Sequence, residues 1–175
     1  FHNLFEPPNG IHFIRKTDSL SFVQTYFYNS FDFFFPQNFN LSSNEGRGIS
    51  EFPLIYFISS LSYLIFGQKL YVLKLWILIF NLSGNIYAFK ILRKSHSTLE
   101  ALFGALLFTS STVYIYYAGN YIIDSAALGM SLIGWYYGLY FFKSHSNQHF
   151  YLAIVFFSLS SLTKAYFIIQ PLAWL

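Results

Sequence analysis

Apolar residues are gathered into four long runs in the second half of the chain. Each run is long enough to cross a hydrocarbon core of about 30 Å, which takes roughly 20 helical residues. The runs are Leu70–Leu92, Leu99–Gly119, Tyr121–Phe142 and His149–Ile169. Polar turns separate them, with the sequences RKSHS, GNY and KSHSNQ. Gly and Ser residues scattered within the runs suit close packing of helices in lipid. The pattern predicts four transmembrane spans.

A fifth apolar stretch, Phe52–Phe66, is too short for a typical span. Its polar residues recur at helical spacing, so one face is polar and the other is Leu, Phe and Ile. These polar residues are Tyr56, Ser59, Ser60 and Tyr63. Such a helix fits along a bilayer surface, with Pro53 in its first turn, where a missing N–H does no harm. We therefore favour an interfacial helix, with a short span as the alternative.

Composition places the whole chain in a membrane. Of its 175 residues, 55% are hydrophobic and only 10% are charged, whereas soluble domains carry about 25% charged residues. The net charge of +3 is dispersed without a basic run, which argues against a nucleic-acid partner. The chain has no Cys, and it opens at Phe1 without Met, so we expect its natural beginning to be missing. The predicted fold is all-α, a polytopic transmembrane helical bundle.

The basic turns predict the orientation of the spans. The positive-inside rule favours the cytoplasmic side for Lys90, Arg93, Lys94 and Lys143. The GNY turn then lies outside. If Phe52–Phe66 is interfacial, residues 1–51 form an outer loop, and Asp18, Glu51, Asp124 and Lys164 share the outer face. If Phe52–Phe66 spans instead, Asp18 and Glu51 lie on the other side from Asp124 and Lys164.

Ionisable residues in or beside the runs are the candidates for chemistry. Asp124 stands three residues inside the third run, and Lys164 about five residues before the end of the fourth. At such depth, charged groups commonly face a polar cavity or a partner. The alternatives are a snorkelling Lys164, an Asp124 that caps its helix, and a Glu51 that serves the helix dipole of the short helix. Asp18, with Thr17, could likewise mark a helix start.

Other chemistries find little support in the sequence. The five His residues show no ligand-pair spacing on one helix, so a histidine metal site is not predicted. There is no Gly-rich phosphate loop and no nucleophile elbow.

Four motifs, in order along nearly the whole chain, resemble a known group of enzymes. The stretch FEPPNGIHFIRKTDS is similar to the first outer loop of polyprenyl-phosphate-sugar-dependent membrane glycosyltransferases. EFPLIYFISSLSYLIFG resembles the Glu-x-Pro segment and juxtamembrane helix of the protein mannosyltransferase and lipid A aminoarabinose transferase families. IIDSAALGMSL looks like their second-outer-loop Asp, and SLSSLTKAYF like their Leu-Thr-Lys motif.

This resemblance implies the GT-C fold, with residues 1–51 as the first outer loop, 52–66 as the interfacial helix and 70–175 as the transmembrane bundle. It also implies a sugar donor on a polyprenyl phosphate, an integral membrane location with the site on the outer face of a bacterial plasma (inner) membrane, and a chain truncated at both ends. The acceptor stays open.

The resemblance also assigns roles. It maps the catalytic Asp to Asp18, which would act as the base that takes a proton from the acceptor hydroxyl. Lys164, Arg15 and Lys16 could supply cations to the leaving phosphate. Glu51 and Asp124 could hold sugar hydroxyls or a divalent metal ion.

Two departures weaken the metal assignment. Many members have Asp-Glu where this chain has Asp18 and Ser19, and Lys-Pro-Pro where it has Phe52 and Pro53. Alternatives to an active glycosyltransferase are a transporter or flippase segment and an inactive family member. A transporter would more often show broken helices near the midplane, whereas charge here gathers at one face.

Overall fold

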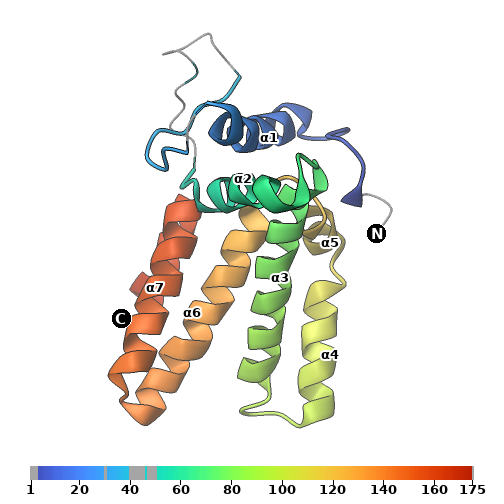
Figure 1. Cartoon of the computed structure of the whole chain (residues 1–175). Coiled ribbons are helices and arrows are strands. Elements are labelled where there is room, and N and C mark those ends of the chain that lie inside the picture. The colour runs from blue at the N-terminus through green and yellow to red at the C-terminus, as the bar shows by residue number, and fades with distance from the viewer. Residues whose placement is uncertain (1–3, 30, 40–45, 47–50, 175) are drawn as a thin grey trace. The chain divides into compact units, whose positions relative to one another are not determined.

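The computed structural model describes residues 4–29, 31–39, 46 and 51–174, and the regular structure in these ranges is helical (Figure 1). The helices are α1 (Phe13–Tyr28), α2 (Leu54–Phe66), α3 (Tyr71–Leu92), α4 (Thr98–Thr109), α5 (Thr112–Ala118), α6 (Asp124–Ser144), α7 (Asn147–Thr163), the 3₁₀ helix η3 (Ala165–Ile168) and α8 (Ile169–Trp174). The predicted all-α class is confirmed. The chain forms two compact units. Unit 1 is Phe1–Ile77 with Gly119–Ile123, and unit 2 is Leu78–Ala118 with Asp124–Leu175, so the boundary falls within α3.

Unit 1 is built on the packing of α1 against α2. The rings of Phe22 and Tyr56 stack with centroids 5.3 Å apart. The polar stripe of α2 is buried, including Ser59 and Ser60. Its apolar residues Leu61, Leu64, Ile65 and Phe66 are exposed instead. The sidedness predicted from the sequence is present, with the polar face buried in protein and the apolar face exposed.

Two features of unit 1 support an interfacial position for α2. The helix has 13 residues, which give a length of about 20 Å, short of the roughly 30 Å of a hydrocarbon core. In addition, the GNY turn meets the N-terminal segment, because the Tyr121 hydroxyl donates to the Glu6 carbonyl at 2.7 Å. Lys74, at the start of α3, donates to the same carbonyl at 2.9 Å and lies 4.2 Å from the Tyr121 ring centroid. A spanning α2 would separate these groups.

In unit 2, small residues bring the helix backbones together. A Cβ added to Gly84 of α3 would lie 2.4 Å from the Cα of Gly129 in α6, and one added to Gly129 would lie 2.2 Å from the Phe80 carbonyl oxygen. Between α6 and α7, the buried Ser160 hydroxyl donates to the Ala127 carbonyl at 2.8 Å. The basic turns after α3 and after α6 lie at the same end of unit 2 (Figure 1).

The prediction of four continuous spans needs correction. In the described chain only α3 has the length and apolar composition of a span, and α4 with α5 adds a second if a bent pair counts as one. The second predicted run is bent by 71° between Thr109 and Thr112. Its sequence there is Thr-Ser-Ser-Thr, and the Thr109 and Ser110 hydroxyls bond carbonyls one turn back, which weakens a helix locally.

The last two runs also differ from the prediction at their ends. The third run becomes helical only at Asp124, because Tyr121 and its neighbours belong to the turn that packs in unit 1. The fourth run is helical to Thr163 rather than to Ile169. A polytopic bundle therefore stays a prediction.

Candidate functional site

Helix α1 carries three of the candidate residues, Arg15, Lys16 and Asp18. It begins at Phe13, so Asp18 lies in its second turn, and the alternative that Asp18 and Thr17 mark a helix start is wrong. Arg15 and Lys16 fall at the N-terminal end of α1, where the helix dipole favours anions and disfavours cations. Helix stability therefore does not explain why two cations stand there.

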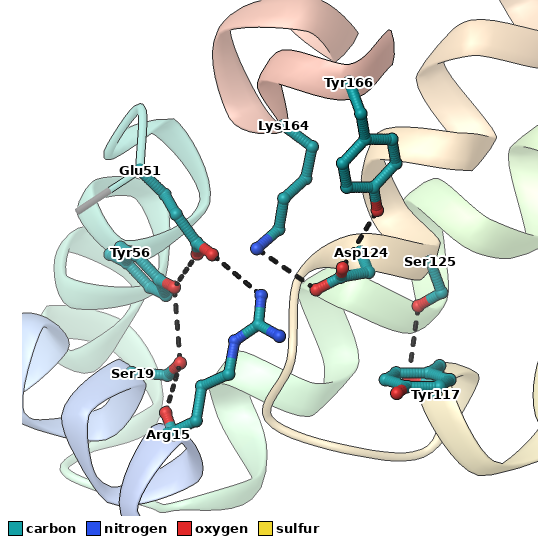
Figure 2. A network of polar contacts seen from close by, with 9 residues as sticks. All are labelled: Arg15, Ser19, Glu51, Tyr56, Tyr117, Asp124, Ser125, Lys164 and Tyr166. Atoms are coloured by element: carbon teal, nitrogen blue, oxygen red, sulfur yellow. Dashed lines mark hydrogen bonds and ion pairs between the residues drawn. The ribbon is translucent and has the colours of Figure 1, made fainter. Parts of the chain in front are cut away.

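Arg15 takes part in a polar cluster within unit 1, which we call the Glu51 cluster: Arg15, Ser19, Glu51 and Tyr56 (Figure 2). The Arg15 guanidinium lies 3.1 Å from one Glu51 oxygen, and the Tyr56 hydroxyl donates to the other at 2.7 Å. Ser19 and Tyr56 hydroxyls are 3.3 Å apart. The cluster joins α1 to Glu51, three residues before the start of α2, so the loop glutamate is held by both helices.

Lys16 and Asp18 point to different surroundings. The Lys16 ammonium is buried and donates to the Asn9 carbonyl at 2.7 Å. The Asp18 side chain is half-buried, and no hydrogen bond or ion pair joins its carboxylate to another residue of the described chain. Arg15 precedes Asp18 by three positions, so the two residues lie on the same side of α1.

A second group, the Asp124 cluster, lies within unit 2 and consists of Asp124, Lys164 and Tyr166 (Figure 2). The Lys164 ammonium is 3.2 Å from one carboxylate oxygen of Asp124, and the Tyr166 hydroxyl donates to the other at 2.9 Å. The Lys164 side chain is only 8% exposed and that of Asp124 is 22% exposed. Asp124 is also the first residue of α6, where the helix dipole stabilises its negative charge.

Backbone geometry corrects the expected settings of both residues. Lys164 is extended, with φ −143° and ψ 111°, and it separates α7 from η3 rather than lying inside a helix. Asp124 is the first residue of α6 rather than a residue inside the helix. It therefore lies at the helix start, as the capping alternative expects, and it also forms an ion pair with Lys164. A snorkelling lysine would reach toward water, whereas this ammonium is buried against a carboxylate.

A cavity of about 500 Å³ adjoins the Asp124 cluster in unit 2. Asp124, Ser125 and Tyr166 lie on its wall, and the other lining side chains are mostly aromatic or aliphatic. They are Phe108, Ser111, Val113, Tyr114, Tyr117, Leu128 and Phe167. Tyr114 is held by the side-chain oxygens of Asn81 and Asn85 at 2.6 and 2.5 Å. The cavity is therefore largely apolar, and the Asp124 carboxylate is the charged group on its wall.

Sequence reasoning missed the tyrosines. Tyr56, Tyr114 and Tyr166 each donate to a carboxylate or amide oxygen of the candidate region. The sequence analysis placed Tyr56 on the polar face of the short helix but gave it no role at the site. Tyr166 had a signal, because it lies two positions after the lysine of the Leu-Thr-Lys motif, whereas nothing in the pattern distinguishes Tyr114 among the 15 Tyr residues of the chain.

The predicted metal at Glu51 and Asp124 finds no support in the contacts. Each carboxylate already meets a cation and a tyrosine hydroxyl within its own unit. Among the described residues, no group of three or more His, Asp or Glu side chains could hold a metal ion. The donor set therefore does not fit a divalent cation, and we assign no step to one.

Residues 50–175 match the sequence model of a family of membrane glycosyltransferases that use a polyprenyl-phosphate sugar donor. The chain belongs to this family, the dolichyl-phosphate-mannose-protein mannosyltransferases. The matched region includes Glu51, Asp124 and Lys164 and begins after Asp18. Comparisons with curated proteins and with solved structures found no match.

Proposed function

We propose that this protein transfers a sugar from a polyprenyl phosphate to an acceptor hydroxyl at the outer face of a bacterial plasma membrane. The Asp124 cluster supports the proposal most directly, because it pairs a buried lysine with a carboxylate that lies on the wall of an aromatic cavity. A lipid-linked sugar phosphate has the matching parts: an anionic phosphate, a polar sugar and an apolar chain. The positive-inside distribution of Lys and Arg supports the orientation.

Lys164 would stabilise the leaving phosphate. In the reaction, the acceptor oxygen attacks the anomeric carbon, the bond from that carbon to the phosphate oxygen breaks, and the electron pair goes to the phosphate. A cation aimed at this oxygen stabilises the charge that develops in the transition state. Asp124 holds the ammonium through the ion pair, and the Tyr166 hydroxyl in turn donates to Asp124. Arg15, held by Glu51, and Lys16 stay further candidates for this role, as the family resemblance suggests.

Asp18 would act as the general base. As the acceptor attacks, its hydroxyl proton has to leave, and a carboxylate on the helix can take it. Glu51 and Asp124 are the candidates to bind sugar hydroxyls, a role that the family resemblance assigns to them, and the cavity wall at Asp124 offers room for such a contact. The acceptor molecule is left open by this assignment.

The test is release of polyprenyl phosphate from a labelled donor by membranes that contain the full-length protein. We expect release that depends on an added acceptor and on Asp18. As matched controls, Asp32→Asn and Lys69→Met change an exposed Asp and an exposed Lys outside both clusters, and they should retain activity. Transport of intact donor across sealed vesicles without release would support a flippase instead. Neither release nor transport would support an inactive family member.

A further inference from the structure

A group of lysines and tyrosines gathers at the end of unit 2 where α3 and α6 end. We call it the lysine–tyrosine patch: Tyr87, Lys90, Lys94, Tyr136, Tyr140 and Lys143. The Lys94 ammonium lies 4.6 Å from the Tyr136 ring centroid and 4.5 Å from that of Tyr140. The Lys90 ammonium lies 4.5 Å from the Tyr87 ring centroid and 5.8 Å from that of Tyr136. Ring faces thus hold both ammonium groups, as cation–π attraction favours.

The patch concentrates positive charge without acidic partners. In the part of the chain that the structure describes, no carboxylate pairs with Lys90, Lys94 or Lys143. Burial and the like charge of Lys143 lower the pKa of Lys94, so the two cations stand close enough to repel each other. Glu100, the next acid along the chain, caps α4 by accepting from the Ser97 backbone N–H at 2.9 Å. An anion at the patch would relieve the repulsion.

The position of the patch suggests which anion it meets. Lys143 is near the last residue of α6 and Asp124 is the first, so 19 helical steps of 1.5 Å separate them by roughly 28 Å. This distance is close to the thickness of a hydrocarbon core. The patch therefore falls at the headgroup level of the membrane face opposite to the Asp124 cluster, where Tyr rings and Lys side chains are favoured.

We propose that the lysine–tyrosine patch binds the phosphate of an anionic phospholipid in the cytoplasmic leaflet. This goes beyond the transfer reaction and rests only on the membrane location of the family. A positive-inside signal alone needs basic residues near the end of a span, but it needs no ring faces to hold their ammonium groups in place. Here the rings hold the Lys90 and Lys94 ammonium groups in place but do not neutralise their charge. An anion from outside the chain would neutralise it. A phosphodiester at the membrane surface is such an anion, and basic sites between helices on this face are suited to it.

The experiment uses the full-length protein in detergent and measures its melting temperature during titration with phosphatidylglycerol or phosphatidylcholine. We expect a rise with phosphatidylglycerol, because a ligand that binds only the folded state stabilises it. Phosphatidylcholine and inorganic phosphate should give no comparable rise. Lys90→Gln and Lys94→Gln should each weaken the apparent affinity for phosphatidylglycerol by about fivefold. Lys69→Gln, a matched loss of charge in unit 1, should leave it unchanged.

Three results would overturn the proposal. An equal rise with phosphatidylcholine would show a general lipid effect, and an equal rise with inorganic phosphate would show an anion site that needs no lipid. An equal loss of affinity in Lys69→Gln and Lys94→Gln would show attraction by net charge alone. If Lys94→Gln does not fold, the exposed Lys143→Gln carries the same test. The experiment measures a melting temperature and not sugar transfer. A negative result would therefore count against the lipid site without bearing on the proposed transfer reaction.

Discussion

Replacing Lys164 by Met separates a lysine that binds phosphate from one that only balances Asp124. Met keeps much of the length and apolar stem of the side chain but removes the charge. A hydrogen bond to a charged group contributes about 1.5–3 kcal/mol. If Lys164 contacts the donor phosphate, we therefore expect donor affinity to fall about 10- to 150-fold, since each 1.4 kcal/mol is a factor of ten.

The loss of Lys164 also has a structural cost, which a second substitution removes. In Lys164→Met the Asp124 carboxylate keeps the Tyr166 hydroxyl and the helix dipole but loses its cation, so stability should fall by about 1–3 kcal/mol. Asp124→Asn in the same chain removes the unbalanced charge. The double variant should recover stability and leave donor binding weak, because the phosphate still lacks its cation.

The assay measures the equilibrium binding of a fluorescent polyprenyl-phosphate sugar to the purified protein, with thermal unfolding followed in parallel. Lys69→Met serves as the control for loss of a positive charge. Normal donor affinity in the double variant would refute the phosphate role. Lys164 would then be only the partner of a buried carboxylate.

The remaining predictions address the base, the helix crossing and the cavity wall. Asp18→Asn should lower the transfer rate by a factor of roughly 10² to 10⁴ with thermal unfolding unchanged, and retention of most activity would move the search for the base elsewhere. Gly129→Ala should destabilise the protein by about 1–3 kcal/mol, because the added methyl meets a backbone carbonyl. Gly104→Ala is its control, since that methyl meets only the Leu92 side chain, and equal melting temperatures for the two variants would contradict the packing argument. Tyr114→Phe keeps the ring on the cavity wall but removes the hydroxyl bound to two asparagines. Stability should fall by about 1 kcal/mol in thermal unfolding, and an unchanged melting temperature would show that the contact is dispensable.

The sequence predicted the parts of this fold that depend on periodicity. The apolar run Leu70–Leu92 is almost the same as α3, and the polar stripe of Phe52–Phe66 is the buried face of α2. Both follow from the spacing of side chains around a helix, which is local information. The bend in the second run and the early end of the fourth were not predicted, because Thr and Ser also occur inside the helices, as in Ser158–Thr163 of α7, and so do not by themselves mark a break.

The candidate site was predictable as a set of charged residues but not as a set of contacts. Apolar surroundings made Asp124 and Lys164 conspicuous, and the structure joins them within unit 2. Arg15 and Glu51 are joined within unit 1 by a contact across 36 positions, which no local pattern reveals. The tyrosine hydroxyls were hidden for a different reason. Tyr and Phe are so common in membrane proteins that their presence alone indicates no role. Only the position of the tyrosine hydroxyl oxygen distinguishes a residue of the site from one that contacts lipid.

The inverted amphipathic character of α2 has a consequence for how the enzyme would respond to its membrane. If α2 lies at the bilayer surface as we expect, with its exposed leucines in the lipid and its polar face on α1, the bilayer surface sets its depth. Glu51 and Arg15 are bound to this helix pair and would keep that depth. Membranes differ in thickness by several ångströms, and spanning helices adjust to the difference by tilting. A surface helix has no second face to match, so the Glu51 cluster would meet a donor headgroup at the same height in a thin membrane as in a thick one.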